Sequence, residues 1–198
     1  LDDTFLDPKV FNKNSVIGVP GLFKCWKKGN VGIINALGTG VADDKAVYSY
    51  VNKMIVYYLG EQPILNQVET FLCEDKVHRQ HVIENISKLV VKPANASGGY
   101  GIMIGPKAPK KEREEVIKKI KKNPRDFVAQ PLEILSTTPT ISENGIEPRH
   151  LDLRPFVLNG KSTYVTTGGL TRVALRKGST IVNSSQGGGS KDTMVVDT

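Results

Sequence analysis

Cysteine, histidine and aromatic residues are scarce in this 198-residue sequence, and long apolar runs are missing. The two cysteines, Cys25 and Cys73, have no partner at zinc-site or redox spacing, so neither a disulfide framework nor a zinc centre is predicted, and a reducing compartment is expected. The longest apolar runs, such as 31–37 with Gly32 inside it, fall far short of the roughly 18 residues that cross a bilayer. The composition, 39% hydrophobic and 24% charged, is that of a globular protein with no membrane partner.

Three histidines are too few for a convincing metal or catalytic network. His78 and His81 would share a helix face, but no third ligand is apparent. No Gly-x-Ser-x-Gly turn and no catalytic triad are present. The first residues, Leu1-Asp2-Asp3-Thr4, carry neither a secretory signal nor an initiating Met. The sequence therefore indicates a fragment of a longer, cytoplasmic protein.

The net charge of +7 is concentrated in one segment. Between Lys107 and Arg125 the excess of Lys and Arg over Glu accounts for nearly all of it. Val116, Ile117 and Ile120 recur there at helical spacing, with acidic residues near the start and basic residues near the end, as the helix dipole favours. A solvated amphipathic helix explains the segment. Aromatic residues that could stack bases do not alternate with the charges, so no nucleic-acid partner is expected.

The pattern of apolar residues and turn signals predicts an α+β chain with a mixed first part. Helices are expected over Asp43–Leu59, ended by Gly60, and over His78–Lys88. Strands are expected at Val31–Ala36, Leu89–Pro93, Ile102–Gly105 and Asp126–Pro131.

The last part of the chain reads as almost wholly extended. The expected strands are Arg149–Leu158, Ser162–Thr167, Gly169–Leu175 and Thr180–Val182. Between the first two, Asn159-Gly160 is the strongest hairpin signal in the sequence. A strand-rich second lobe is therefore predicted.

One constellation of residues could bind phosphate. Lys92 ends a predicted strand and precedes the glycine turn Gly98-Gly99-Tyr100-Gly101, so an ammonium and backbone N–H groups could meet phosphate oxygens. It is not a Walker A loop, because no lysine follows the second glycine. The alternative is an ordinary β-hairpin with an exposed lysine.

Other charged residues carry weaker signals. Asp43 and Asp44 are best explained as helix N-cap or first-turn residues. Lys45, in the same first turn, is unfavourably placed for the helix dipole, which mildly suggests an anion nearby. Asp152 and Arg154 share one strand face and could simply pair with each other.

Five strings carry a more specific signal. They are Phe5-Leu-Asp-Pro8, Gly38-Thr-Gly-Val-Ala-Asp-Asp-Lys-Ala46, Arg149-His-Leu-Asp-Leu-Arg-Pro-Phe-Val157, Gly168-Gly-Leu-Thr-Arg-Val-Ala-Leu175 and Asn183-Ser-Ser-Gln-Gly-Gly-Gly-Ser-Lys-Asp192. Together they resemble the circularly permuted ATP-grasp type 2 family of the ATP-grasp ligases. The resemblance covers nearly the whole chain, and members of that family are longer on both sides.

The resemblance implies a circularly permuted ATP-grasp fold of the α+β class, with two α+β lobes clasping ATP and Mg²⁺. Residues 1–37 would be a permuted segment of the second lobe, 38–130 the first lobe and 131–198 the strand-rich second lobe. It also implies a carbon–nitrogen ligase similar to glutathionylspermidine synthetase, in which a small-molecule or peptide carboxylate is phosphorylated and the acylphosphate is attacked by an amine. The alternative is a non-catalytic ATP-binding module of a larger protein.

The resemblance also implies roles for individual residues. Lys45 and Lys92 would hold the ATP phosphates, and the loop containing Ser97, Gly98, Gly99 and Gly101 would cover them. The stretch from Gln130 to Glu133 would receive adenine through backbone groups. In the second lobe Asp152 and Arg154 would face the nucleotide, Arg172 would stabilise the transferring phosphoryl group, and Asn183 would reach the phosphates or a metal.

The metal ligands follow least directly from the resemblance. Asp2 or Asp3 would be the first acidic ligand, since Mg²⁺ prefers carboxylates and phosphate oxygens. The resemblance also implies a later Glu-x-Asn pair, and no clear one follows. Asn35 could stand in for its asparagine, but Ile33 stands where the glutamate would be and cannot bind a cation. Three possibilities stay open: ligands upstream of Leu1, a metal held differently, or a degenerate site that binds ATP without ligation.

Overall fold

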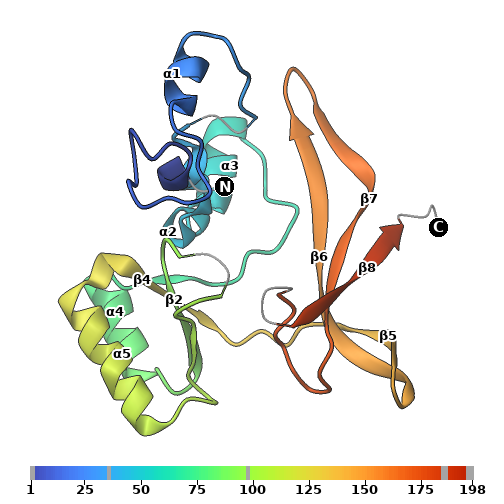
Figure 1. The fold of residues 1–198 in the computed structure, drawn as a ribbon. Helices are drawn as coiled ribbons and strands as arrows, with labels where there is room; N and C mark the ends of the chain where they lie inside the picture. Colours follow the sequence, from blue (N-terminus) through green and yellow to red (C-terminus); the bar gives the residue numbers. More distant parts are fainter. Residues whose placement is uncertain (1–2, 35–36, 97–98, 184–186, 195–198) are drawn as a thin grey trace. The chain divides into compact units, whose positions relative to one another are not determined.

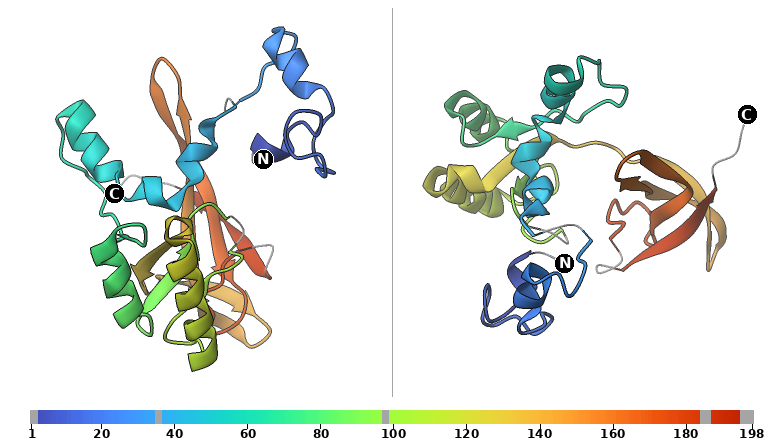
Figure 2. Two further views of the ribbon diagram at one scale, coloured as in Figure 1. Left: turned by 90° about the vertical axis from the view of Figure 1, so that its left-hand side faces the viewer. Right: turned by 90° about the horizontal axis from the view of Figure 1, so that it is seen from above.

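The computed structural model describes residues 3–34, 37–96, 99–183 and 187–194 (Figures 1 and 2). Its backbone divides into two compact units, one built on residues up to Ala96 and Gly101–Pro131, the other on Leu132 onward. Within the described residues each unit holds one four-stranded sheet. Across the same ranges, no helix has both the length and the apolar character needed to span a bilayer. The predicted α+β class is confirmed.

A buried carboxylate organises the start of the first unit. Asp7 has no exposed surface and accepts hydrogen bonds from the backbone N–H groups of Lys9, Gly21 and Phe23, at 2.9, 3.0 and 3.0 Å. Burial would raise the pKa of this carboxyl, but the three N–H groups outweigh burial and the pKa is lowered. The carboxylate thereby joins the N-terminal loop to helix α1 (Leu22–Lys27).

The single helix predicted over Asp43–Leu59 forms as two α-helices, α2 (Lys45–Tyr48) and α3 (Val51–Leu59), and the 3-10 helix η2 (Thr39–Asp43) precedes them. Asp44 separates η2 from α2, because its backbone is extended and its carboxylate caps α2 by accepting the Ala46 N–H at 2.8 Å. The N-cap prediction is thus confirmed for Asp44. Gly60 ends α3 with a left-handed backbone, φ 67°, also as predicted.

The strand predicted at Val31–Ala36 is wrong. Residues 31–34 pair with no described strand, and the Ile34 side chain is 95% exposed; Asn35 and Ala36 lie outside the described residues. Strand propensity reflects packing against neighbours more than an intrinsic backbone preference. Residues 31–34 therefore stay irregular, because they lie beside no described strand with which they could pair.

The first sheet has the order β1-β4-β2-β3, and all its pairs are antiparallel. Its strands are β1 (Phe71–Leu72), β2 (Leu89–Pro93), β3 (Met103–Ile104) and β4 (Phe127–Pro131). Figures 1 and 2 show α4 (Lys76–Glu84) and α5 (Lys110–Lys122) side by side against this sheet. The predicted basic helix is α5, which buries Val116 and Ile120 and leaves its lysines exposed.

Helices α4 and α5 pack on one face of this sheet, and the hydrophobic core lies between them and that face. Leu89, Val91 and Ala129 pack there with Val82 of α4 and Ile120 of α5. Because successive residues of a strand point to opposite faces, Lys92 and Gln130 lie on the other face. The helices thus support a sheet whose second face, the polar face, carries Lys92 and Gln130 beside the buried Val90 and Val128.

The second unit is an antiparallel meander. Its strands, in both chain and sheet order, are β5 (Thr137–Ser142), β6 (Gly145–Asn159), β7 (Thr163–Ala174) and β8 (Gly188–Met194). The predicted hairpin is confirmed, since Asn159 and Thr163 are register partners and the Thr163 hydroxyl donates to Asn159 Oδ1 at 2.8 Å.

The strand predicted at Thr180–Val182 is wrong. The edge of β7 pairs instead with β8, where Gly188 stands opposite Ala174. A Cβ atom at Gly188 would lie 2.2 Å from the carbonyl oxygen of Val182. Glycine at this position therefore lets the segment before β8 approach the start of the strand closely.

Candidate functional site

Lys92 is a half-buried lysine on the polar face of the first sheet. Its ammonium Nζ donates a hydrogen bond to Gln130 Oε1 at 2.6 Å. Burial lowers its pKa, and the positive charge of Lys45 lowers it further. Within the described residues neither lysine forms an ion pair. Two positive charges therefore lie close enough to act on each other, and Lys45 is also acted on by the carboxylates of Asp44 and Asp43.

Lys45 begins helix α2 and is docked on the end of β2. Its backbone N–H donates to the Ala94 carbonyl oxygen at 2.8 Å, and its Nζ donates to the Ala96 carbonyl oxygen at 2.5 Å. Burial lowers the pKa of Lys45, although the charges of Asp44 and Asp43 partly offset this. Lys45, which is unfavourably placed for the helix dipole, is thus held near Lys92, the other predicted phosphate ligand.

Arg125 fixes the beginning of α2, although it lies 81 positions after Asp44 in the sequence. It lies in η3 (Pro124–Asp126), and its Nη2 donates to Asp44 Oδ2 at 2.7 Å. Burial would raise the pKa of Asp44, but the hydrogen bond from Arg125 prevails and the pKa is lowered. This ion pair holds Asp44, the residue that precedes Lys45, in place.

The predicted glycine loop is described only in part. Gly99 and Gly101 have left-handed backbones, with φ 79° and 72°, and a Cβ atom at Gly101 would lie 2.9 Å from the Pro93 ring. Both positions therefore favour glycine for conformational reasons. Ser97 and Gly98 lie outside the described residues.

Gln130 and Glu133 take different positions at the end of β4. The Gln130 side chain bridges Lys92 and Thr70, with its Nε2 donating to Thr70 Oγ1 at 2.8 Å. Glu133 follows the strand and is exposed. The adenine role of this stretch, which concerns backbone groups, stays a prediction.

In the second unit, the structure brings four predicted site residues together. Arg172 of β7 faces its register partner Asp152 of β6, and its Nε donates to Asp152 Oδ1 at 2.9 Å while Nη2 donates to Oδ2. Arg172 Nη1 donates to Asn183 Oδ1 at 3.3 Å, and Arg154 Nε lies 3.9 Å from Asp152 Oδ2. The hydrogen bond from Arg172 lowers the pKa of Asp152. Asp152 pairs mainly across strands rather than with Arg154.

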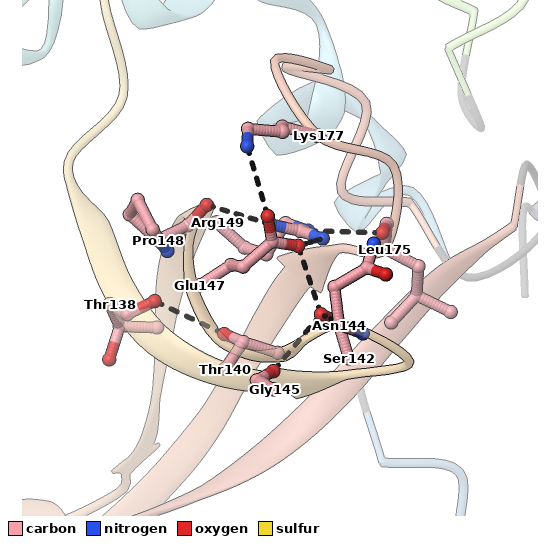
Figure 3. A network of polar contacts seen from close by, with 10 residues as sticks. All are labelled: Thr138, Thr140, Ser142, Asn144, Gly145, Glu147, Pro148, Arg149, Leu175 and Lys177. Carbon is pink, nitrogen blue, oxygen red and sulfur yellow. Dashed lines mark hydrogen bonds and ion pairs between the residues drawn. The ribbon is translucent and has the colours of Figure 1, made fainter.

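A second polar cluster in this unit was not predicted (Figure 3). The Glu147 carboxylate accepts hydrogen bonds from Arg149 Nη2 at 2.7 Å, Lys177 Nζ at 2.9 Å and Ser142 Oγ at 2.9 Å. Arg149 is 5% exposed and also donates to the carbonyl oxygen of Leu175. Glu147 and Arg149 stand two apart on one strand, which is the signal that could have revealed the pair. The cluster joins β5, β6 and the loop after β7.

This cluster makes stability sensitive to acid. Hydrogen bonds from Arg149, Lys177 and Ser142 lower the pKa of Glu147 to about 2. A lowered carboxyl pKa contributes stability that is complete above the unfolded pKa of roughly 4.3 and is lost as pH falls toward 2. We therefore expect Glu147→Gln to be less stable than the unmodified protein at pH 7, with the difference shrinking between pH 5 and pH 2. Urea unfolding between pH 7 and pH 2 measures the difference in the free energy of unfolding. A difference that does not change with pH would contradict the prediction.

Of the three predicted metal ligands, Asp3 alone lies among the described residues, so the metal site stays a prediction. Asp2 and Asn35 lie outside the described residues. Asp3, in η1 (Asp3–Phe5), accepts the Gly38 N–H at 2.7 Å through Oδ2. A search of the described ranges finds no group of three His, Cys, Asp or Glu residues able to hold a metal. His78 instead accepts the Leu72 N–H at 3.2 Å through Nδ1.

The chain is of the α+β class with two antiparallel sheets, and within the described residues Lys45 and Lys92 form no ion pair. The chain belongs to the circularly permuted ATP-grasp type 2 family, whose model matches residues 1–174. The family predicted from the sequence and its fold class are thereby confirmed.

Relatives from several bacteria are similar over almost the whole chain. An uncharacterised protein of Synechocystis sp. is 54% identical over 197 residues, which are 99% of this chain and 41% of that protein. One from Mycobacterium tuberculosis is 52% identical over 99% of this chain and 36% of its own length. A Frankia casuarinae protein named as a candidate glutamate–cysteine ligase is 49% identical over 90% of this chain and 21% of its own length. The chain thus spans less than half of each.

Proposed function

We propose that the whole protein is an ATP-dependent ligase that joins a small-molecule or peptide carboxylate to an amine through an acylphosphate. The observation that carries this proposal is the pair Lys45 and Lys92, two partly buried cations that form no ion pair within the described residues and that act on each other electrostatically. Membership of the ATP-grasp family supports it. The ligase name of the Frankia relative also supports it, although the match covers 21% of that protein.

In the proposed reaction, an oxygen of the substrate carboxylate attacks the γ-phosphorus of ATP, and the bond between that phosphorus and the ADP oxygen breaks. The amine nitrogen then attacks the carbonyl carbon of the acylphosphate, inorganic phosphate leaves, and the nitrogen loses a proton as the amide forms. Lys45 and Lys92 would bind and orient the triphosphate. Catalysis of this kind depends on positioning and charge neutralisation rather than on covalent protein chemistry.

The residues of the second unit would act on the transferring group. Asp152 holds the guanidinium of Arg172 through two of its nitrogens, which fixes its plane before any ligand binds. Arg172 would then stabilise charge on the phosphoryl oxygens, with Arg154 and Asn183 beside it. Within the described residues no group of three His, Cys, Asp or Glu residues forms that could hold Mg²⁺ without the nucleotide, and Asp3 accepts the Gly38 N–H. No step is therefore assigned to a protein-bound metal.

The second candidate is a non-catalytic ATP-binding module. A thermal-shift titration with Mg-ATP, with GTP as control, tests both candidates for ATP binding. About a hundredfold excess over the dissociation constant should stabilise the protein by roughly 2.7 kcal/mol. A screen for ADP release against pools of carboxylates and amines then separates the two. ADP that forms only when both substrates are present supports the ligase; binding without any ADP supports the module.

A further inference from the structure

Gln130 holds the Lys92 ammonium through its side chain, a contact that neither the sequence nor the family match assigns. The two residues are 38 positions apart and meet across strands, because Lys92 pairs in register with Val128 while Gln130 pairs with Val90. Both side chains consequently lie on the face of the sheet that α4 and α5 leave uncovered.

A chain of hydrogen bonds fixes which way the Gln130 amide points. The Thr70 hydroxyl donates its single proton to the Val68 carbonyl oxygen at 3.0 Å, so toward Gln130 it can only accept. It accepts from Gln130 Nε2 at 2.8 Å, which leaves the amide oxygen for Lys92. A flipped amide would direct an N–H group at an ammonium.

The same chain reaches back to the helix that begins with Lys45. The Val68 N–H donates to the Tyr48 hydroxyl at 3.0 Å, and the Gln67 side chain donates to the Tyr48 carbonyl oxygen. Tyr48 is the last residue of α2. The segment that orients Gln130 is therefore tied to the element that carries the other lysine.

The neutral character of the acceptor matters for an anion site. A carboxylate at this position would form an ion pair with Lys92 and cancel its charge, whereas an amide oxygen accepts the hydrogen bond and leaves the charge in place. We propose that Gln130, locked by Thr70, is a positioning residue that holds the Lys92 ammonium toward the phosphates of ATP without neutralising it. This proposal rests on the proposed function.

The test uses four variants and two ligands. Isothermal titration of Mg-ATP and of inorganic tripolyphosphate should show about tenfold weaker binding of both to Gln130→Leu, since a hydrogen bond to a charged group contributes about 1.5 kcal/mol. Thr70→Val should weaken binding in the same direction, and Thr70→Ser should bind like the unmodified protein. Melting temperatures measured alongside identify any variant that fails to fold.

Gln130→Glu gives a readout of the contact with Lys92 that does not depend on nucleotide binding. A carboxylate beside Lys92 raises the pKa of the ammonium, so its titration, followed by NMR of the Lys side chains without nucleotide, should move to higher pH than in the unmodified protein. Binding of Mg-ATP to this variant should be weaker than to Gln130→Leu at pH 7.

The outcomes separate this proposal from the proposed function. If the unmodified protein binds Mg-ATP but Gln130→Leu and Thr70→Val bind it equally well, Gln130 does not position Lys92. An unchanged Lys92 titration in Gln130→Glu overturns the contact even if no nucleotide binds. If the Lys92 titration moves as expected in Gln130→Glu but the unmodified protein binds neither Mg-ATP nor tripolyphosphate, the contact between Gln130 and Lys92 is confirmed. The proposed function then fails, and so does the positioning role that rests on it. Should Gln130→Leu fail to fold, the Thr70→Val and Thr70→Ser pair decides.

Discussion

Lys92→Met should weaken the binding of Mg-ATP by about a hundredfold. The substitution keeps the aliphatic stem in its half-buried position and removes only the charge that Gln130 holds at 2.6 Å. Losing a charge from a partly desolvated anion site costs on the order of 3 kcal/mol, which corresponds to that factor. Titration calorimetry at constant ionic strength measures the change directly.

The matched control for this loss is Lys111→Met. Lys111 is exposed on the basic helix α5, so its replacement makes the same change in net charge without touching the polar face of the sheet. We expect its affinity for Mg-ATP to stay within about twofold of the unmodified value, because exposed charges are screened by solvent and salt. Equal losses in the two variants would show that overall charge, rather than a site at Lys92, attracts the nucleotide.

The parts of the fold that could be predicted from the sequence are those fixed by local signals. Helix α5 combines an apolar stripe with a favourable charge gradient, and the hairpin after Asn159 follows from its turn residues. By contrast β1 is two residues long and exists only because Phe71 and Leu72 pair with β4. β8 is rich in glycine and polar residues, so its sequence gives no strand signal, and only the free edge of β7 makes it a strand.

The candidate site divides in the same way. Lys45 and Arg172 could be predicted as site residues because whole strings around them resemble a known family, and Lys92 because it ends a predicted strand before a glycine turn. Their surroundings could not, because these depend on register between strands: Gln130 meets Lys92 only through the pairing of β2 with β4. Likewise the spacing of Asp152 and Arg154 favours a pair within one strand, whereas the shorter contact runs across strands to Arg172. Cross-strand geometry, not residue type, selects the partner.

Arg172→Met should slow ADP release by about a hundredfold while changing the affinity for Mg-ATP little. A guanidinium has five N–H donors, and the contacts to Asp152 and Asn183 engage its three nitrogens without using all five. The remaining donors are held in a fixed plane and could bind phosphoryl oxygens as their charge builds up. Removing a donor of this kind typically costs two to three orders of magnitude in rate, on the order of 3 kcal/mol. The assay is ADP release with the carboxylate and amine that the substrate screen identifies.

Two further variants decide whether the rate loss belongs to this guanidinium. Arg172→Lys keeps a positive charge but lacks the planar fork that Asp152 holds, so it should recover only a small part of the rate. Arg176→Met removes an exposed arginine from the same unit and should leave the rate unchanged. A full recovery in Arg172→Lys would reduce the role of Arg172 to its charge. If Arg172→Met instead weakens the binding of Mg-ATP and leaves the rate of ADP release unchanged, Arg172 is a ligand of the nucleotide. It would then not be the residue that stabilises the transferring phosphoryl group.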